Sequence, residues 1–296
     1  MLVKRILILF GVMVAVMLTG CDRNDIPGIF NGTSPHANER FTASMEWNAA
    51  HGYATLRVDD EYKGYVASDS HIEEGKDANL KRFVLAYKAD KDCPFAIHLG
   101  DMINIRNVHS LFEQDLAIEP EGYVKGSDTI FTVAGNHDLF FNQWGEFLKY
   151  RHTSTFYVET LSKTSGKKLD FYIFIDSGSG TLGTEQTEWL RQMLDERSQM
   201  GYRHIIICTH THFFEVDMSQ GTTSCYALEE TTTLTSMFSK YNVSLVLTGH
   251  NHHFKENIYG NVRYLTLDAL KDDASNAAYL ILEVGAGLAY SENKLN

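Results

Sequence analysis

The chain has 296 residues, 44% of them apolar, which is enough for one large domain or two small domains with a hydrophobic core. Its 26 basic and 38 acidic side chains give a formal net charge of −12 at pH 7. This balance argues against tight binding to a nucleic-acid polymer, which needs clustered lysine and arginine, but it does not exclude a small phosphate ester drawn to a metal ion.

The first 20 residues have the pattern of an export signal. Lys4 and Arg5 precede an uninterrupted apolar run at positions 6–18, which is too short to span a bilayer. The run ends in LTGC, which resembles the lipobox of bacterial lipoproteins. That resemblance implies acylation of Cys21 and a lipid anchor in the cell envelope, on the periplasmic or surface side of a bacterial membrane. The alternative is an ordinary signal peptide with a fortuitous cysteine.

From about residue 64 onward, short apolar runs alternate with stretches of helical periodicity. The near-continuous apolarity of the runs predicts strands buried on both faces, and the alternation predicts an α/β sandwich. Helices are expected over 77–87, 140–150 and 185–197, with Thr184 as the N-cap of the last. The final two strands are expected to form an antiparallel pair. The predicted strands cover 64–68, 94–100, 129–135, 169–176, 204–209, 243–249, 263–269 and 278–284.

No linker is recognisable after residue 44, so one catalytic domain is expected. The predicted organisation is a signal peptide at 1–20, a tether at 21–44 and the domain at 45–296.

A polar cluster follows each of five predicted strands. Ligands in open α/β sheets bind outside the carboxyl ends of the strands, so the five loops should converge there. Seven potential metal ligands are too many for one ion and suit two ions that share a ligand. Mixed carboxylate, imidazole and amide ligation suits Mn, Fe or Zn without selecting among them. The seven residues are Asp69, His71, Asp101, Asn136, His210, His250 and His252.

The triplet Asn136-His137-Asp138 can be interpreted in two ways from its residues alone. Asn and Asp tolerate unusual backbone angles and bond their own main chain, so the triplet could be a turn. An amide, an imidazole and a carboxylate together could equally form part of a metal or acid/base site.

Five motifs stand in order along the chain: DSH (69–71), GDMIN (100–104), GNHD (135–138), a lone His210 and GHNH (249–252). Over about residues 64–285 the sequence resembles the calcineurin-like metallophosphoesterase superfamily. The resemblance implies mixed sheets with flanking helices and a dinuclear metal site at the carboxyl ends of the strands. It also implies a metal-bridging hydroxide as the nucleophile in phosphoric ester hydrolysis.

The resemblance assigns roles to single residues. It implies that Asp69, His71, Asp101 and His252 hold the first metal, that Asp101, Asn136, His210 and His250 hold the second, and that Asp101 bridges the two. His137 would face the substrate and either protonate the leaving oxygen or stabilise phosphoryl charge, and Asp138 would orient the His137 ring.

Two positions depart from the family pattern. Asn104 stands where an acidic residue is often found, and we expect it to support the site without binding metal. His210 follows its strand directly and is preferred as the ligand over His212, which is expected to line the substrate mouth.

The expected function is therefore hydrolysis of a small phosphate ester, either as a phosphodiesterase or as a phosphomonoesterase. The alternative is a non-catalytic surface lipoprotein that binds or scavenges metal. Such a protein would need the seven ligands but not His137 with Asp138 behind it. No protein partner can be inferred.

Overall fold

The computed structural model describes residues 36–73, 75–112, 130–140, 143–214 and 226–295. The predicted signal peptide, Cys21 and most of the predicted tether lie outside these ranges. No helix among the described residues has the length and apolarity needed to cross a bilayer.

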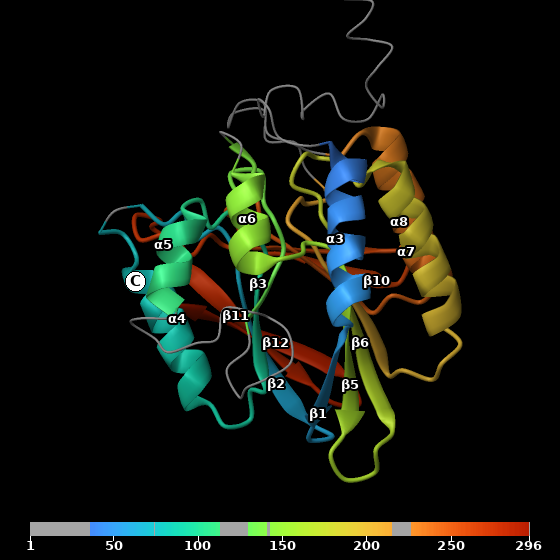
Figure 1. Ribbon diagram of the computed structural model, residues 1–296. Coiled ribbons are helices and arrows are strands. Elements are labelled where there is room, and N and C mark those ends of the chain that lie inside the picture. The colour runs from blue at the N-terminus through green and yellow to red at the C-terminus, as the bar shows by residue number, and fades with distance from the viewer. Residues whose placement is uncertain (1–35, 74, 113–129, 141–142, 215–225, 296) are drawn as a thin grey trace, which may run out of the picture.

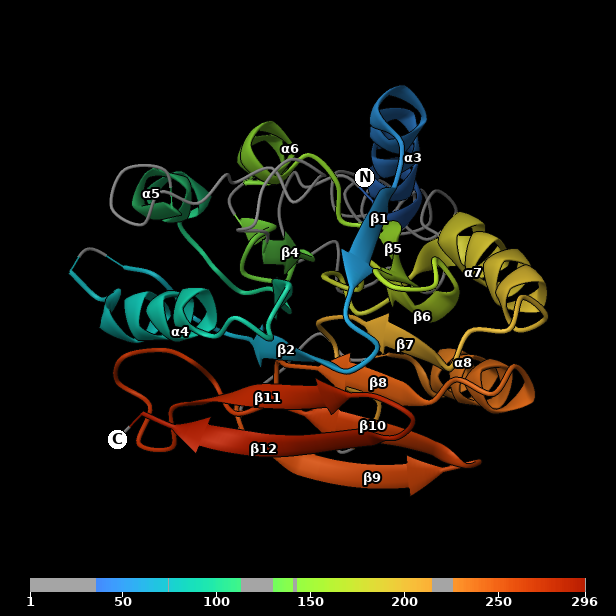
Figure 2. The same cartoon turned by 90° about the horizontal axis from the view of Figure 1, so that it is seen from below.

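Two mixed β-sheets lie face to face, with helices on their outer sides (Figures 1 and 2). One sheet has seven strands in the order β1-β5-β6-β7-β8-β10-β9, and the other has five in the order β12-β11-β2-β3-β4. The strands are β1 (Ala54–Val58), β2 (Tyr62–Ala67), β3 (Phe95–His98), β4 (Ile130–Thr132), β5 (Phe156–Ser162), β6 (Lys168–Phe174), β7 (His204–Cys208), β8 (Leu245–Thr248), β9 (Lys255–Tyr259), β10 (Val262–Thr266), β11 (Ala278–Val284) and β12 (Leu288–Lys294).

The helices divide between the two sheets. Helices α4, α5 and α6 pack on the five-stranded sheet, and α7 and α8 pack on the seven-stranded sheet. Helix α3 lies beside α7 (Figure 1). Their bounds are α3 (Ala37–His51), α4 (Ala78–Ala89), α5 (Ile105–Ser110), α6 (Trp144–Arg151), α7 (Gly183–Arg197) and α8 (Leu228–Lys240).

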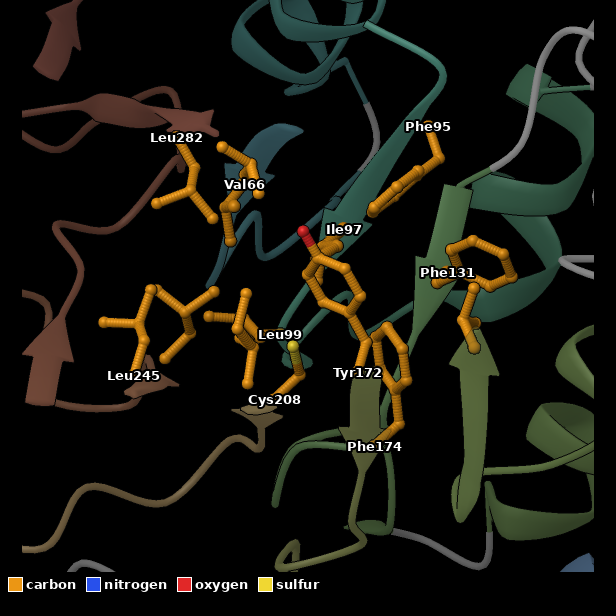
Figure 3. Packing of buried hydrophobic residues seen from close by; sticks show 14 of the residues in the cluster. Val66, Phe95, Ile97, Leu99, Phe131, Tyr172, Phe174, Cys208, Leu245 and Leu282 are labelled. Atoms are coloured by element: carbon orange, nitrogen blue, oxygen red, sulfur yellow. The ribbon is translucent and has the colours of Figure 1, made fainter. Parts of the chain in front are cut away.

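The main core lies between the sheets. Figure 3 shows Val66 and Phe131 of one sheet on the same core as Tyr172 and Leu245 of the other. Separate apolar clusters join each sheet to its helices. Central strands therefore bury side chains on both faces, which explains their near-continuous apolarity. The predicted α/β sandwich with mixed sheets and flanking helices is confirmed.

All eight predicted strands are present, but the expected pairing of the last two is wrong. Strand β10 lies in the seven-stranded sheet and pairs with β8 and β9, whereas β11 lies in the five-stranded sheet between β12 and β2. Each of the two strands has an antiparallel partner that the sequence did not reveal. Strands β9 and β12 are edge strands rich in polar residues, so no apolar run marked them. Strands β1 and β5 and helices α3, α5 and α8 were likewise not predicted.

Helix α3 corrects the predicted domain boundary. It crosses residues 44 and 45, and the side chains of Arg40 and Phe41 are buried against the domain. Asn38 accepts a hydrogen bond from the Glu185 amide in the first turn of α7 and donates one to Thr184 Oγ1. The expected N-cap Thr184 is therefore inside α7, whose first turn is capped from α3. The folded unit begins before residue 45.

Candidate metal centre

The five motifs meet at one end of the two sheets. Three of the loops follow β2, β3 and β4 of the five-stranded sheet, and two follow β7 and β8 of the seven-stranded sheet. The site is thus shared between the sheets, at the carboxyl ends of strands from both.

Four of the predicted ligands form a first group, in which one side-chain atom of each residue lies within 4.8 Å of the others: Asp69, His71, Asp101 and His252. His252 Nε2 lies 3.2 Å from Asp69 Oδ1, and His71 Nε2 lies 3.6 Å from Asp101 Oδ2. These are separations that an ion between the side chains could bridge.

A second group contains Asp101, His210 and His250, and one side-chain atom of each again lies within 4.8 Å of the others. His210 Nε2 lies 3.0 Å from Asn136 Oδ1 and 3.1 Å from His250 Nδ1, so Asn136 belongs to this group as well. Asp101 is common to both groups. Its Oδ2 is 3.4 Å from His210 Nε2, while its Oδ1 accepts the His137 amide at 2.8 Å. One carboxylate oxygen therefore faces both groups.

Two observations show that the donor set fits metal ions. The Nε2 atoms of His71 and His250 are buried and have no hydrogen-bond partner among the described residues, a costly state unless a cation binds them. His210 Nδ1 donates to the Leu99 carbonyl at 2.8 Å, which leaves Nε2 directed at the second group. This pattern, a ring nitrogen fixed by a backbone carbonyl, is usual behind a metal-binding histidine.

The electrostatics of the metal-free cluster point the same way. Burial opposes ionisation of Asp69, but the nearby imidazoles of His252 and His71 hold its pKa well below the usual value. Burial likewise opposes ionisation of Asp101, yet the charge of His210 lowers the Asp101 pKa to about 2. Burial should lower the pKa of His210, but the Asp101 carboxylate raises it to about 9. The cluster therefore holds two carboxylate anions and attracts positive charge.

The ligand loops have unusual backbone conformations. Gly100 and Gly135 bring two motifs into backbone contact, because a Cβ on Gly100 would lie 2.5 Å from the Gly135 nitrogen. Six other residues of these loops have φ between 44° and 70°, a region that non-glycine residues seldom adopt. They are Asp69, His71, Asp101, Ile103, His250 and His252.

Asp138 has a different role from the expected one. Its Oδ2 accepts the amides of Asp101 and Gly135, and its Oδ1 accepts the amide of Ile103, each at 2.9 Å. Both oxygens are thus used on the main chain, and Asp138 ties the second motif to the third instead of orienting the His137 ring. Burial and the nearby Asp101 charge raise the Asp138 pKa to about 7.

His137 is half-buried and lines a cavity of about 510 Å³ that opens onto the ligands. Its ring lies between those of His71 and Phe140, at centroid distances of 4.8 and 4.6 Å. Burial lowers its pKa, although the Asp101 charge opposes the shift.

The two remaining predicted residues, His212 and Asn104, differ in their place relative to the cavity. His212 lines the cavity, and burial lowers its pKa to about 4. Asn104 does not line the cavity, and its side chain accepts the Asn107 amide at 3.3 Å as the N-cap of α5.

Sequence reasoning missed several cavity residues in the segment between β10 and β11. Lys271 is the one lysine or arginine among the described residues that line the cavity. Its amide donates to the Asp69 carbonyl at 3.1 Å, which fixes this segment beside the first group. Asn276 Nδ2 donates to the His252 carbonyl at 3.0 Å. No motif marks these residues, because their place depends on a connection between the two sheets.

Comparison with known proteins gave one family and several structures. The family model described as calcineurin-like phosphoesterase matches residues 63–254. No curated protein sequence matched.

Three solved structures share the fold at low identity. A dimetal phosphatase from Danio rerio is 12% identical, with a TM-score of 0.58, over 79% of this chain and 96% of that chain. GAP50 of Plasmodium, described as the anchor in the inner membrane complex, is 14% identical, with a TM-score of 0.55, over 80% and 89%. The purple acid phosphatase PPD1 from yellow lupin is 16% identical, with a TM-score of 0.55, over 80% and 52%.

Proposed function

The chain belongs to the calcineurin-like phosphoesterase family, and on that premise we propose that it hydrolyses small phosphoric esters at a dinuclear metal site. The observation that carries the proposal is the pair of ligand groups that share Asp101. A shared carboxylate is what two ions a few ångströms apart require, because it offsets their mutual repulsion.

When bound, the two ions would neutralise phosphoryl oxygens and supply a nucleophilic oxygen from water at neutral pH. The other steps belong to the residues of the chain. The cavity of about 510 Å³ has room for a small ester beside the ligands. His137, at its wall, would hydrogen-bond the leaving oxygen or a phosphoryl oxygen and, in its protonated form, would give the proton that the leaving alkoxide takes up. Asp138 holds the backbone of the loops that present Asp101 and His137.

His137 favours an enzyme over a metal-scavenging protein. It lines the cavity but belongs to neither ligand group. A protein that only stores metal would not need a histidine at this position. The fold alone does not decide, since the Plasmodium neighbour is described as an anchor and the Danio rerio neighbour as a phosphatase.

The test is hydrolysis of bis-p-nitrophenyl phosphate and p-nitrophenyl phosphate by a form that lacks residues 1–21. It is run after metal removal and after addition of Mn, Zn or Fe. We expect turnover to return with metal, and His137→Ala to lower kcat by about 10²–10⁴-fold while two ions still bind. The ratio of the two rates assigns a diester or a monoester preference. Binding of two ions without turnover of either ester would favour the scavenging protein.

We further propose that the protein is exported and anchored by lipid at Cys21, which would place the active site at a bacterial envelope membrane. The support is the sequence LTGC after an apolar run of signal length. Cells that express the full chain should incorporate labelled fatty acid into it, and Cys21→Ser should abolish the label. Equal labelling of the two forms would rule out this anchor.

A further inference from the structure

Helix α3 contributes a buried arginine to the domain. The side chains of Arg40 and Asp176 are each 1% exposed. Arg40 Nε lies 2.9 Å from Asp176 Oδ2, and its Nη2 lies 3.1 Å from Oδ1. Nη2 also donates to Ser179 Oγ at 3.0 Å. A planar guanidinium that binds both carboxylate oxygens fixes the orientation of the carboxylate as well as its position.

Asp176 in turn holds the loop that follows β6. Its Oδ1 accepts the Gly178 amide at 3.0 Å. Its own amide donates to Gln186 Oε1 at 2.8 Å, and Gln186 Nε2 donates back to the Asp176 carbonyl at 2.8 Å. The loop 176–179 is therefore clamped between α3 on one side and α7 on the other.

Ser177 connects this loop to the metal centre. Its Oγ accepts Thr209 Oγ1 at 2.7 Å and the Thr211 amide at 2.8 Å. Thr211 Oγ1 also donates to the Ser177 carbonyl at 2.7 Å. These bonds hold the residues on both sides of His210, a member of the second ligand group.

The same loop touches the third motif. A Cβ placed on Gly178 would lie 2.9 Å from the Gly135 carbonyl oxygen and 2.9 Å from Leu139. Gly135 precedes Asn136, which also belongs to the second group. Displacement of the loop 176–179 would therefore disturb both His210 and the turn that carries Asn136.

We propose that Arg40 is a positioning residue for the second metal: through Asp176 and Ser177 it fixes the segment that presents His210. Arg40 lies outside the family match, which begins at residue 63, so the family pattern does not predict this role. The inference rests on the metal site of the proposed function and not on its hydrolytic step. The first group has no ligand on the clamped segment, so its ion should bind independently of Arg40.

A purely structural role must be separated from a positioning role. Loss of Arg40 alone would leave the Asp176 charge buried and unpaired, which would lower the stability of the fold under either role. The test therefore uses Arg40→Met together with Asp176→Asn, which removes both charges and keeps an acceptor for the Gly178 amide. Arg40→Lys is the second variant, because it retains the positive charge but lacks the planar guanidinium that binds both carboxylate oxygens of Asp176.

Asn48→Ala is the matched control on the same helix. Asn48 is buried, and its Nδ2 donates to the Thr155 carbonyl at 2.7 Å, so it anchors α3 beside β5. It reaches the loop 176–179 less directly than Arg40 does, through the hydrogen bond of Thr155 to Gln186. His210→Ala identifies which step of a metal titration belongs to the second group.

Metal-free protein is titrated with Mn²⁺ by calorimetry, and thermal unfolding is followed by circular dichroism. We expect the double variant to weaken the His210-dependent step about tenfold, Arg40→Lys to weaken it by a smaller factor, and the first step to change less than twofold. Asn48→Ala should lower Tm and leave both steps unchanged.

Unchanged affinity for both ions in the double variant would overturn the proposal, as would equal weakening of both steps. A wild-type chain that binds no Mn²⁺ at all would refute the proposed metal site itself, which is a different outcome.

Discussion

At the scale of single residues, the site combines backbone strain with buried charge. Several ligand residues have positive φ, a conformation that costs on the order of 1 kcal/mol for each non-glycine residue. Asp138 offsets part of this cost, because it binds three amides of the strained loops. In these strained conformations the ligand side chains of several loops lie together in the two ligand groups.

Lys271 should influence which esters are hydrolysed. Its ammonium group stands at the cavity, 3.7 Å from Asp273, with the side chain 34% exposed. A single positive charge attracts a monoester dianion about twice as strongly as a diester monoanion. Because solvent screens this charge, Lys271→Met is expected to lower kcat/KM about fivefold for p-nitrophenyl phosphate and about twofold for the diester.

The matched control is Lys76→Met. Lys76 lies 3.6 Å from the same Asp273 carboxylate but does not line the cavity. It should leave both values of kcat/KM unchanged. Equal losses for the two esters in Lys271→Met would show that Lys271 does not distinguish them.

At the scale of elements, the hairpin of β9 and β10 depends on its turn. Tyr259 pairs with Val262, and the two residues between them, Gly260 and Asn261, have φ of 56° and 65°. Two consecutive positive φ angles define a type I′ turn, whose twist matches that of the strands. Glycine and asparagine adopt these angles with little strain.

Asn261→Ala is therefore expected to lower the free energy of unfolding by about 1 kcal/mol, because alanine is strained at positive φ. Asn261→Gly should stay within about 0.5 kcal/mol of the wild type. Urea denaturation measures both changes, and kcat should be unaffected, since the turn does not line the cavity. Alanine and glycine variants of equal stability would contradict this account of the turn.

The sequence predicted some helices and strands and missed others, for physical reasons. Most central strands were predicted because burial on both faces leaves an apolar run, whereas β5 is an interior strand whose alternate residues are only partly buried. The edge strands β9 and β12 alternate or expose polar residues, and α3 has a weak apolar face that buries Arg40 instead of a hydrophobic stripe. Such elements give little periodic signal, and α3 in addition packs on α7, which lies far away in the sequence.

At the scale of the whole molecule, the metal centre joins the two sheets. Ligands from the five-stranded sheet meet His210 and His250 from the seven-stranded sheet. Bound ions should therefore stabilise the sandwich as a unit, because they bind the native arrangement and not the unfolded chain.

Metal removal tests this coupling. An ion at 100 times its Kd contributes about 2.7 kcal/mol, and a domain of this size shifts Tm by roughly 2–4 °C per kcal/mol. Dialysis against a chelator removes both ions and should therefore lower Tm by roughly 10–20 °C in calorimetry, and added Mn²⁺ should restore it. Asp101→Asn, which removes the shared carboxylate, should respond much less. A wild-type Tm that does not change on dialysis against the chelator would refute the coupling.

The sequence by itself determined the α/β sandwich, most of its central strands and the residues that form the two ligand groups. Those features are local, because an apolar run reflects the burial of a single strand and each motif spans only a few consecutive residues. Only the tertiary structure decided that the loops belong to two sheets, that Asp138 binds amides, that Lys271 reaches the cavity and that Arg40 supports His210. These are contacts between distant segments, as in the Arg40–Asp176 pair 136 residues apart, and no local pattern encodes them.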